Sequence, residues 1–309
     1  MAAPLSPTTH NSTGEDASTQ EILRRMDALA RQKPEHVEAL AFFRALLPIL
    51  RRAEVDVPSF ALTPEAARKK FALHQPLLAG EDLPFDTEAA KSLFLQLCRL
   101  SEDDPESPLH SQACMENRHM AAARIRQAVE CDELDLKALL QTAAEGRWQE
   151  LIPLVDVQRL EPDVLRTLAE LSLAPSLRAW AREAAIHVDL DEWRQEICPM
   201  CGSRPMLSEI QGKEGVRRLR CGLCGAGWYY PRLKCAICGN EDYHALGTIY
   251  VEGEKEKYRL QTCDACKNYI KVVITFEPNP VELLMVEDLV TLHLDVIAGE
   301  QGFSRFKHL

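Results

Sequence analysis

The stretch Cys198-Pro-Met-Cys201 opens a short window, residues 198–266, that holds eight of the eleven cysteines in this 309-residue chain. The eight fall into four CxxC pairs: Cys198/Cys201, Cys221/Cys224, Cys235/Cys238 and Cys263/Cys266. Two cysteines separated by two residues can place both sulfurs on one ion from a single turn, and two such turns complete a tetrahedral four-sulfur site. The spacing therefore predicts two metal sites, with all eight of these cysteines as ligands.

The residue that follows each pair predicts how its turn is built. Gly202, Gly225 and Gly239 follow the first three pairs, and glycine adopts without steric cost the positive φ that lets backbone N–H groups point at thiolates. Lys267 holds this position after the fourth pair, which predicts a strained or differently built turn there. We expect the first pair to join the second and the third to join the fourth, because interleaved pairing would enclose longer loops.

The ligand set leaves the metal and its role open. Iron and zinc both accept four thiolates in a tetrahedron, so the cysteines alone do not distinguish them. Four cysteines leave no coordination position for water or substrate, which argues against hydrolytic metal catalysis. Structural metal sites and redox-capable metal sites therefore remain as the two interpretations.

A disulfide framework is the alternative to metal, since the number of paired cysteines is even. The segment from Met1 to Thr19 is rich in Ser, Thr, Ala and Pro and has no apolar core of a signal peptide. No twin-arginine signal opens the chain, and no apolar run approaches membrane-spanning length. We therefore expect a reduced, cytoplasmic protein without a transmembrane segment.

Composition and periodicity predict an α+β protein. Its N-terminal all-α domain is followed by two tandem small β modules, zinc-ribbon-like in layout, and by a C-terminal helix. The expected divisions are a disordered tail (1–19), the helical domain (20–192), a first Cys₄ module (193–232), a second Cys₄ module (233–277), and a C-terminal helix and tail (278–309).

Local signals give the expected elements. Helix starts are expected at Ser18 (with Glu21 in a capping box), Pro34, Thr63-Pro64, Asp86 and Ser107-Pro108, and helices over Met120–Ala144, Pro162–Ser172 and Pro175–Val188. Strands are expected at Arg217–Arg220, Gly227–Tyr230, Gly247–Val251, Tyr258–Thr262 and Tyr269–Phe276. A last helix would carry Val281, Leu284, Leu289, Leu292 and Val296 on one face, covering a ribbon or returning to the helical body.

The net charge of −11 is unevenly distributed. Between Gln195 and Thr275 the sequence has 12 Lys and Arg against 9 Asp and Glu, and the rest of the chain has 24 against 38. An acidic helical body argues against nucleic-acid binding, in which positive charge supplies most of the affinity. We therefore expect no nucleic-acid partner, although a nucleic-acid-binding zinc ribbon stays as a weaker alternative.

Several other residue patterns have a functional and a structural interpretation. Glu116/His119 and Glu241/His244 have the spacing of a di-iron motif, but solvated positions explain them better. Single cysteines among helical apolar residues favour core packing over a reactive thiol; they are Cys98, Cys114 and Cys131. The run Trp228-Tyr229-Tyr230 favours the core of the small module over a binding surface. A basic cluster favours a solvated strand face over a site for a polyanion or acidic peptide; it comprises Arg217, Arg218, Arg220, Arg232 and Lys234.

No phosphate loop, dinucleotide fingerprint or nucleophile elbow is present in the sequence. We therefore expect no catalytic residues and no organic cofactor site, and a protein that is not an enzyme, apart from possible redox activity at the metal.

The cysteine-bearing part resembles the formate dehydrogenase accessory protein family, FdhE. The resemblance lies in the runs Trp193-Arg-Gln-Glu-Ile-Cys198-Pro-Met-Cys201, Gly215-Val-Arg217-Arg-Leu219-Arg-Cys221, Trp228, Arg232-Leu-Lys-Cys235, Cys263-Asp-Ala-Cys266-Lys-Asn-Tyr269 and Glu287-Asp-Leu-Val-Thr-Leu-His-Leu-Asp295. It covers Trp193 to about Gly302, while the helical part agrees only in size and position.

This resemblance implies a cytoplasmic, chaperone-like assembly factor that contacts the immature catalytic subunit of a respiratory formate dehydrogenase before export. It also implies iron, rather than zinc, in two rubredoxin-like Cys₄ sites. A rubredoxin-type electron carrier is the alternative from another functional class.

Overall fold

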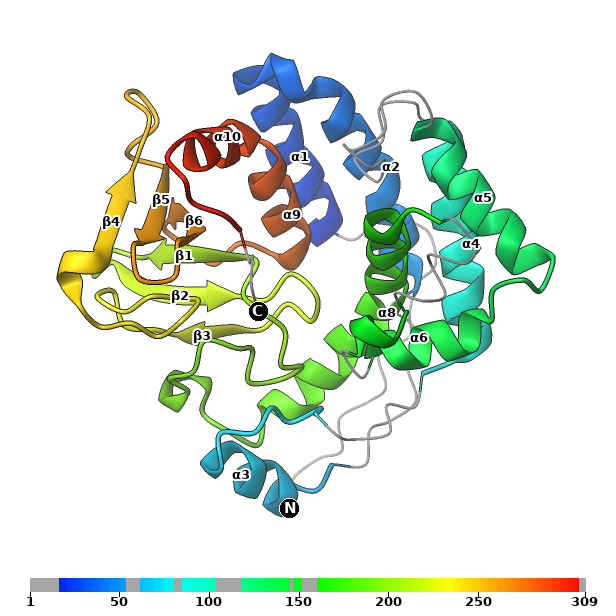
Figure 1. Cartoon of the computed structure of the whole chain (residues 1–309), viewed down its shortest axis with the longest axis horizontal. Helices are drawn as coiled ribbons and strands as arrows, with labels where there is room; N and C mark the ends of the chain where they lie inside the picture. Colours follow the sequence, from blue (N-terminus) through cyan, green and yellow to red (C-terminus); the bar gives the residue numbers. More distant parts are fainter. Residues whose placement is uncertain are drawn as a thin grey trace, which may run out of the picture.

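The computed structural model describes residues 17–53, 62–79, 85–103, 118–144, 147–151 and 160–305. Helices fill the described chain up to residue 192, and the strands and two last helices follow it (Figure 1). The predicted α+β class, with helices first and cysteine-bearing β structure after them, is confirmed.

The helical part begins with α1 and packs around α4 and α8. Its helices are α1 (Ala17–Gln32), α2 (Val37–Ala53), α3 (Pro64–Ala72), α4 (Thr87–Asp103), α5 (Arg118–Glu130), α6 (Leu136–Ala144) and α8 (Pro162–Ala185). Two predicted starts are confirmed by their caps. Thr63 accepts a hydrogen bond from the N–H of Ala66, and Asp86 accepts from the N–H groups of Glu88 and Ala89. The start at Ser107-Pro108 lies outside the described residues.

The structure differs from the predicted helices at two places: one predicted helix is broken in two, and two predicted helices are continuous. The single helix expected over Met120–Ala144 is broken between α5 and α6, where Asp132 has a φ of 56°. The break predicted before Pro175 is absent, because α8 continues through this proline. Buried side chains on both sides of Pro175 hold the helix in the core, so packing offsets the backbone hydrogen bond that proline cannot make. No helix in the described ranges is both long enough and apolar enough to cross a bilayer.

One sheet carries both cysteine modules. Its strands are β1 (Leu207–Gln211), β2 (Val216–Arg220), β3 (Gly227–Tyr229), β4 (Leu246–Ile249), β5 (Tyr258–Cys263) and β6 (Asn268–Thr275), in the order β3-β2-β1-β6-β5-β4. The five predicted strands are present, and β1 is additional. Strand β1 pairs in parallel with β6, whereas every other neighbouring pair is antiparallel. The parallel pair joins a strand of the first module to a strand of the second.

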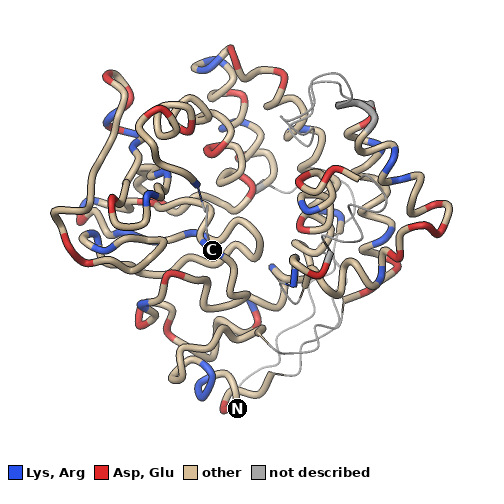
Figure 2. The backbone as a smooth tube through the Cα atoms, in the orientation of Figure 1, with Lys and Arg blue, Asp and Glu red and all other residues tan. Residues whose placement is uncertain are grey.

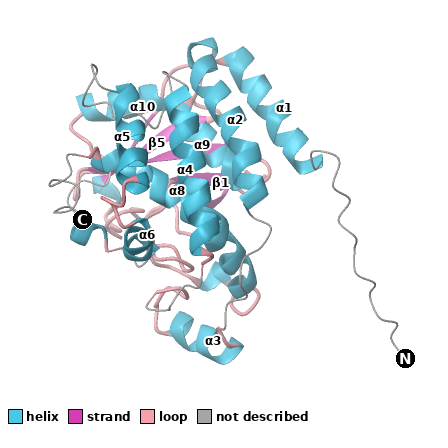
Figure 3. Ribbon diagram, turned by 90° about the vertical axis from the view of Figure 1, so that its right-hand side faces the viewer, coloured by secondary structure: helices cyan, strands magenta, loops and turns pink. Residues whose placement is uncertain are grey.

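The predicted last helix is divided into α9 (Val281–Leu289) and α10 (Leu292–Glu300). Together with α1 these helices cover the face of the sheet that carries Tyr258, Leu260 and Val273. Helix α9 also contacts α1 and α2, so it both covers the sheet and returns to the helical body. The turned view shows the helical layer in front of the strands (Figure 3). Leu292 and Val296 are exposed, so the expectation of one buried face through both helices is wrong at these two residues.

A buried polar cluster fastens the start of α9 to the sheet. Arg220 pairs with Glu209 and donates a hydrogen bond to the carbonyl oxygen of Asn279 at 2.8 Å. The N–H of Asn279 donates to the second carboxylate oxygen of Glu209 at 3.1 Å. Arg217 is also buried, with 1% of its surface exposed. The solvated strand face predicted for the basic cluster is therefore wrong for Arg217 and Arg220.

Candidate metal centres

The four CxxC pairs form the same turn four times. In each turn the N–H of the residue after the second cysteine donates a hydrogen bond to the carbonyl oxygen of the first cysteine, over 2.8–3.2 Å. These residues all have positive φ: Gly202 (76°), Gly225 (79°), Gly239 (71°) and Lys267 (55°). Lys267 thus adopts the conformation of its three glycine counterparts, and the expectation of a differently built fourth turn is wrong. A lysine carries the steric cost of this conformation, which glycine avoids.

The turns meet in two groups of four sulfurs. Cys198, Cys201, Cys221 and Cys224 form the first tetrad, and Cys235, Cys238, Cys263 and Cys266 form the second; within each, the sulfurs lie within 4.8 Å of one another. The predicted sequential pairing of the turns is confirmed.

The sulfur separations fit a four-coordinate metal. Across the first tetrad, Cys198 lies 3.5 Å from Cys224 and Cys201 lies 3.6 Å from Cys221. Two separations in the second tetrad are 3.9 Å each. A tetrahedral ion with metal–sulfur bonds of about 2.3 Å requires sulfurs about 3.8 Å apart, whereas a disulfide requires about 2.05 Å. The donor set and spacing therefore fit zinc or iron, and the cysteines are not bonded to one another.

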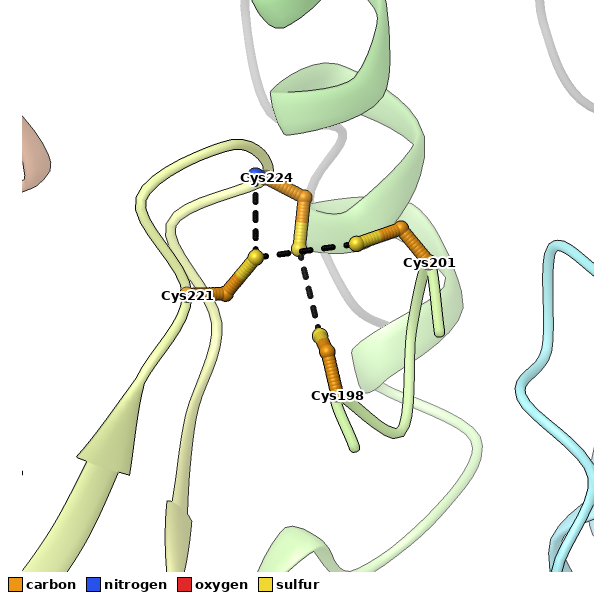
Figure 4. A group of neighbouring side chains, drawn as sticks. All are labelled: Cys198, Cys201, Cys221 and Cys224. Carbon is orange, nitrogen blue, oxygen red and sulfur yellow. Dashed lines mark hydrogen bonds between the residues drawn. The ribbon is translucent and has the colours of Figure 1, made fainter. Parts of the chain in front are cut away.

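The first tetrad is enclosed between the sheet and the helical body. Figure 4 shows its four side chains converging from two turns beside α8. The N–H groups of Leu77 and Leu78, which follow α3, donate to the carbonyl oxygens of Pro199 and Met200 at 2.9 and 2.8 Å. Three of its cysteines are buried within the same apolar core as the helices. The sequence gives no local signal for these two hydrogen bonds, because they join segments about 120 residues apart.

The second tetrad is closer to the surface. Cys238 is exposed and Cys266 is half-buried, while Cys235 and Cys263 are buried. Next to it, the side chain of Leu233 is 70% exposed. The N–H of Ile237 donates to the sulfur of Cys235 at 3.4 Å, which orients that ligand. The two tetrads therefore share a turn geometry and differ in access.

The surroundings set the charge state of the thiols. Burial raises the pKa of Cys198 and of Cys235, since a thiolate there loses its hydration. Hydrogen bonding with Cys198 lowers the pKa of Cys201. Buried thiolates require a compensating positive charge, and metal binding supplies it while releasing protons.

The other predicted positions fall mainly into structural roles. Trp228 and Tyr230 are fully buried, which confirms their packing role; the Tyr230 hydroxyl donates to Glu196 at 2.6 Å. Glu241 and His244 are both exposed, and His244 lies in a short 3-10 helix, Tyr243–Ala245. Glu116 and the side chain of His119 lie outside the described residues.

The three single cysteines differ from one another. Cys98 is buried, as predicted, and burial raises its pKa to about 12. Cys131 is exposed just after α5, so the core role predicted for it is wrong. Cys114 lies outside the described residues.

Known proteins resemble this chain in sequence and in fold. The family models "FdhE, central domain" and "FdhE, C-terminal domain" match residues 197–232 and 233–308. A "Protein FdhE homolog" from Stutzerimonas stutzeri is 33% identical over 297 residues, covering 91% of this chain and 86% of the relative. This chain belongs to the FdhE family.

Two further matches are a relative that covers about half of this chain and a solved structure that shares its fold. A "Protein FdhE homolog" from Aquifex aeolicus is 34% identical over 149 residues, which is 47% of this chain and 51% of that relative. The crystal structure of the FdhE protein from Pseudomonas aeruginosa shares the fold, with a TM-score of 0.59, 24% identity and coverage of 92% of this chain and 91% of that one. Membership makes this chain an accessory protein related to formate dehydrogenase, and confirms the expectation that it is not an enzyme.

Proposed function

We propose that this chain is a cytoplasmic maturation factor that binds the immature catalytic subunit of a respiratory formate dehydrogenase. The observation that supports this proposal is the pair of four-sulfur tetrads in a member of the FdhE family. Each tetrad is a closed ligand set without a position for substrate, which suits a protein that handles or inspects a client better than one that turns over a substrate.

We propose iron as the metal, with all eight paired cysteines as its ligands and zinc as the alternative. Iron in such sites would supply one-electron redox chemistry, whereas zinc would supply only structure. The protein's own contribution is to hold the thiolates in two preformed groups, through four matching turns. It also buries three of the four cysteines of the first group.

We further propose that the helical domain, residues 20–192, holds the client while the two Cys₄ modules, 193–232 and 233–277, respond to its state. Acidic and basic residues are interspersed along the described backbone of both parts (Figure 2). This distribution of charged residues along the chain favours a protein client over nucleic acid, because nucleic-acid binding depends on a concentration of basic residues. Two arginines of the predicted basic cluster, Arg217 and Arg220, are buried, which weakens the nucleic-acid alternative further.

The test is copurification of the tagged full-length chain with the catalytic subunit. Wild type is expected to retain the subunit, and variants with Cys→Ser substitutions in either tetrad are expected to lose most of it. Circular dichroism identifies the variants that stay folded. Full retention by a folded variant that lacks all eight paired cysteines would contradict the proposal.

A rubredoxin-type electron carrier is the second candidate. The exposed ligand Cys238 favours it, because a redox partner could approach the second metal site there. It requires iron, a reversible visible absorption band and turnover with a reductase. Metal analysis and absorption spectra of protein purified with and without oxygen separate these functions. A colourless protein with two zinc ions excludes the electron carrier.

A further inference from the structure

A cavity of about 240 Å³ lies between the third cysteine turn and the sheet. Cys235 and Ile237 of that turn form one side, and Ile270 and Val272 of β6 form the other. Four basic residues line it, Arg217, Lys234, Arg232 and Arg259, and no Asp or Glu does so among the described residues. A cavity whose charged lining is entirely basic favours an anionic ligand.

Arg217 is the deepest of these cations. Its Nε donates to the hydroxyl of Ser208 at 3.1 Å, and its Nη1 donates to the carbonyl oxygens of Pro231 and Lys234 at 2.9 and 2.8 Å. These acceptors fix the guanidinium in place but are neutral. The other terminal nitrogen, Nη2, makes no hydrogen bond within the described part of the chain, and no carboxylate there pairs with Arg217. The arrangement leaves one N–H donor of a rigidly held cation for a ligand.

The remaining cations differ in how far they are neutralised. Lys234 lies 3.4 Å from Glu196 and 3.6 Å from Glu241, so nearby carboxylates balance it. Arg259 donates from its Nε to the carbonyl oxygen of Lys255 and has no carboxylate partner in the described ranges. Arg232 makes neither a hydrogen bond nor an ion pair there. The two arginines therefore add positive charge to that of Arg217.

The second tetrad is the rival explanation for this charge, since Cys235 also lines the cavity. Burial lowers the pKa of Arg217 to about 10, and the neighbouring Tyr230 and, to a smaller extent, Cys235 oppose that change. A tetrad loaded with a divalent ion carries a net charge of about −2, which leaves part of the charge of three arginines uncompensated. The tetrad thus accounts for some of the positive charge and not for all of it.

We propose that this cavity binds a carboxylate attached to a branched apolar body. The carboxylate would accept hydrogen bonds from Nη2 of Arg217 and from Arg232 and Arg259. The apolar body would contact Leu246, Ile270 and Val272. The same chemistry is available from a free organic acid and from the C-terminal residue of a peptide. The proposal is independent of the client-binding function proposed above.

The experiment is isothermal titration of the metal-loaded, full-length chain with 4-methylpentanoate and with its neutral amide. The acid is expected to bind at least about tenfold more tightly, because charge-assisted hydrogen bonds to a carboxylate are lost in the amide. A tripeptide ending in leucine, with a free or an amidated C-terminus, separates the two sources. Tighter binding of the free-ended tripeptide than of the acid identifies a peptide, and the reverse order identifies a small organic acid.

Three variants decide which residues bind the ligand. Arg217→Met is expected to weaken 4-methylpentanoate binding about tenfold, and the double variant Arg232→Ala/Arg259→Ala by a similar factor. Arg218→Ala is the matched control: Arg218 lies on the same strand, pairs with Asp191 instead and is expected to leave binding unchanged.

Equal affinity for acid and amide, or no binding of either, would overturn the proposal. A folded Arg217→Met variant that binds 4-methylpentanoate with full affinity, and differs from wild type only in how well it retains metal, would also overturn it. Arg217 would then serve to balance the charge of the second tetrad. If Arg217→Met does not fold, unchanged affinity in the double variant is sufficient to reject the site.

Discussion

The backbone N–H of Leu77 donates a hydrogen bond to the carbonyl oxygen of Pro199 at 2.9 Å, inside the first cysteine turn. Leu77 follows α3 in the helical part, so this bond ties a ligand-bearing turn to a distant segment of the chain. The side chain of Leu77 is fully buried in a core that also contains Cys198 and Cys221. The first tetrad and the helices are therefore expected to lose their structure together.

Substitution of one cysteine in each tetrad tests this coupling. Cys221→Ser and Cys238→Ser are each expected to remove about one metal equivalent, because three thiolates hold an ion more weakly than four. Metal binding contributes roughly 10–16 kcal/mol to the folding of small structural zinc sites. Cys221→Ser should lower the thermal midpoint of the helical circular dichroism signal, and Cys238→Ser should leave it near that of wild type. Equal midpoints would mean that the helices do not depend on the first tetrad.

Lys267 provides a test of the fourth turn. Lys267→Gly is expected to stabilise the protein by about 1 kcal/mol, because glycine adopts a φ of 55° without the steric cost that lysine carries. Lys267→Ala is the matched control, since it removes the same ion pair with Asp264 but keeps a β-carbon. Urea unfolding of both variants gives the difference. Alanine as stable as glycine would show that the turn is not strained.

The buried pair Arg220–Glu209 should be far more sensitive than an exposed pair on the same strand. Glu209→Gln is expected to destabilise the protein by about 3 kcal/mol, because it leaves a buried guanidinium without its counter-charge. Asp191→Asn removes the partner of Arg218, with Asp191 53% exposed, and should cost less than about 1 kcal/mol. Free energies of unfolding from urea titrations check both values. Similar costs would show that burial does not govern these pairs.

Acid should destabilise the contact between the helical part and the sheet. Burial lowers the pKa of His36 below 6.5, so the unfolded chain takes up its proton first and stability falls as the pH drops below about 6.5. Glu254 is partly buried, but hydrogen bonds from Lys33 and His293 lower its pKa below 4.5, and its contribution is lost as the pH falls through that depressed value.

The pH dependence can be assigned with two variants. His36→Asn should flatten the stability curve between about pH 6.5 and 5, and Glu254→Gln should flatten it only below about pH 4.5. Urea midpoints measured at half-unit intervals of pH give the curves. A wild-type midpoint that rises on acidification would contradict both assignments.

The free and the paired cysteines should react in a defined order. Cys131 is exposed and outside the tetrads, so a thiol reagent should label it at once in the native protein. Cys238 is also exposed but should react only after a chelator removes its metal. Cys98 is buried with a pKa of about 12 and should react only on unfolding. Peptide mass spectrometry follows each site, and immediate labelling of Cys238 without chelator would contradict its role as a ligand.

Short-range patterns predicted the site well. The CxxC spacing and the following glycines depend on only five residues, so the tetrads and their sequential pairing could be read from the sequence. Caps such as Thr63 are equally local and were also predicted. Each of these features is fixed by neighbours in the chain rather than by the fold.

Long-range packing decided the rest. Strand β1 contains Glu209, a residue type that is usually found on the surface. In the fold this glutamate is buried, because Arg220 and the backbone of Asn279 lie beside it and bind its carboxylate. The arginines of β2 looked solvated for the same reason. Pro175 indicated a helix start, but burial on both sides keeps α8 continuous. None of these outcomes follows from a window of a few residues.

The parallel pairing of β1 with β6 also has a consequence for synthesis on the ribosome. The first tetrad can be assembled once Cys224 has left the exit tunnel, and β2 already pairs with one edge of β1 by then. Strand β6, which pairs with the other edge of β1, is complete only when the chain reaches Thr275. During that interval the nascent protein exposes an open strand edge, the kind of surface on which other chains add and aggregate. Slow translation between these two points would lengthen the exposure.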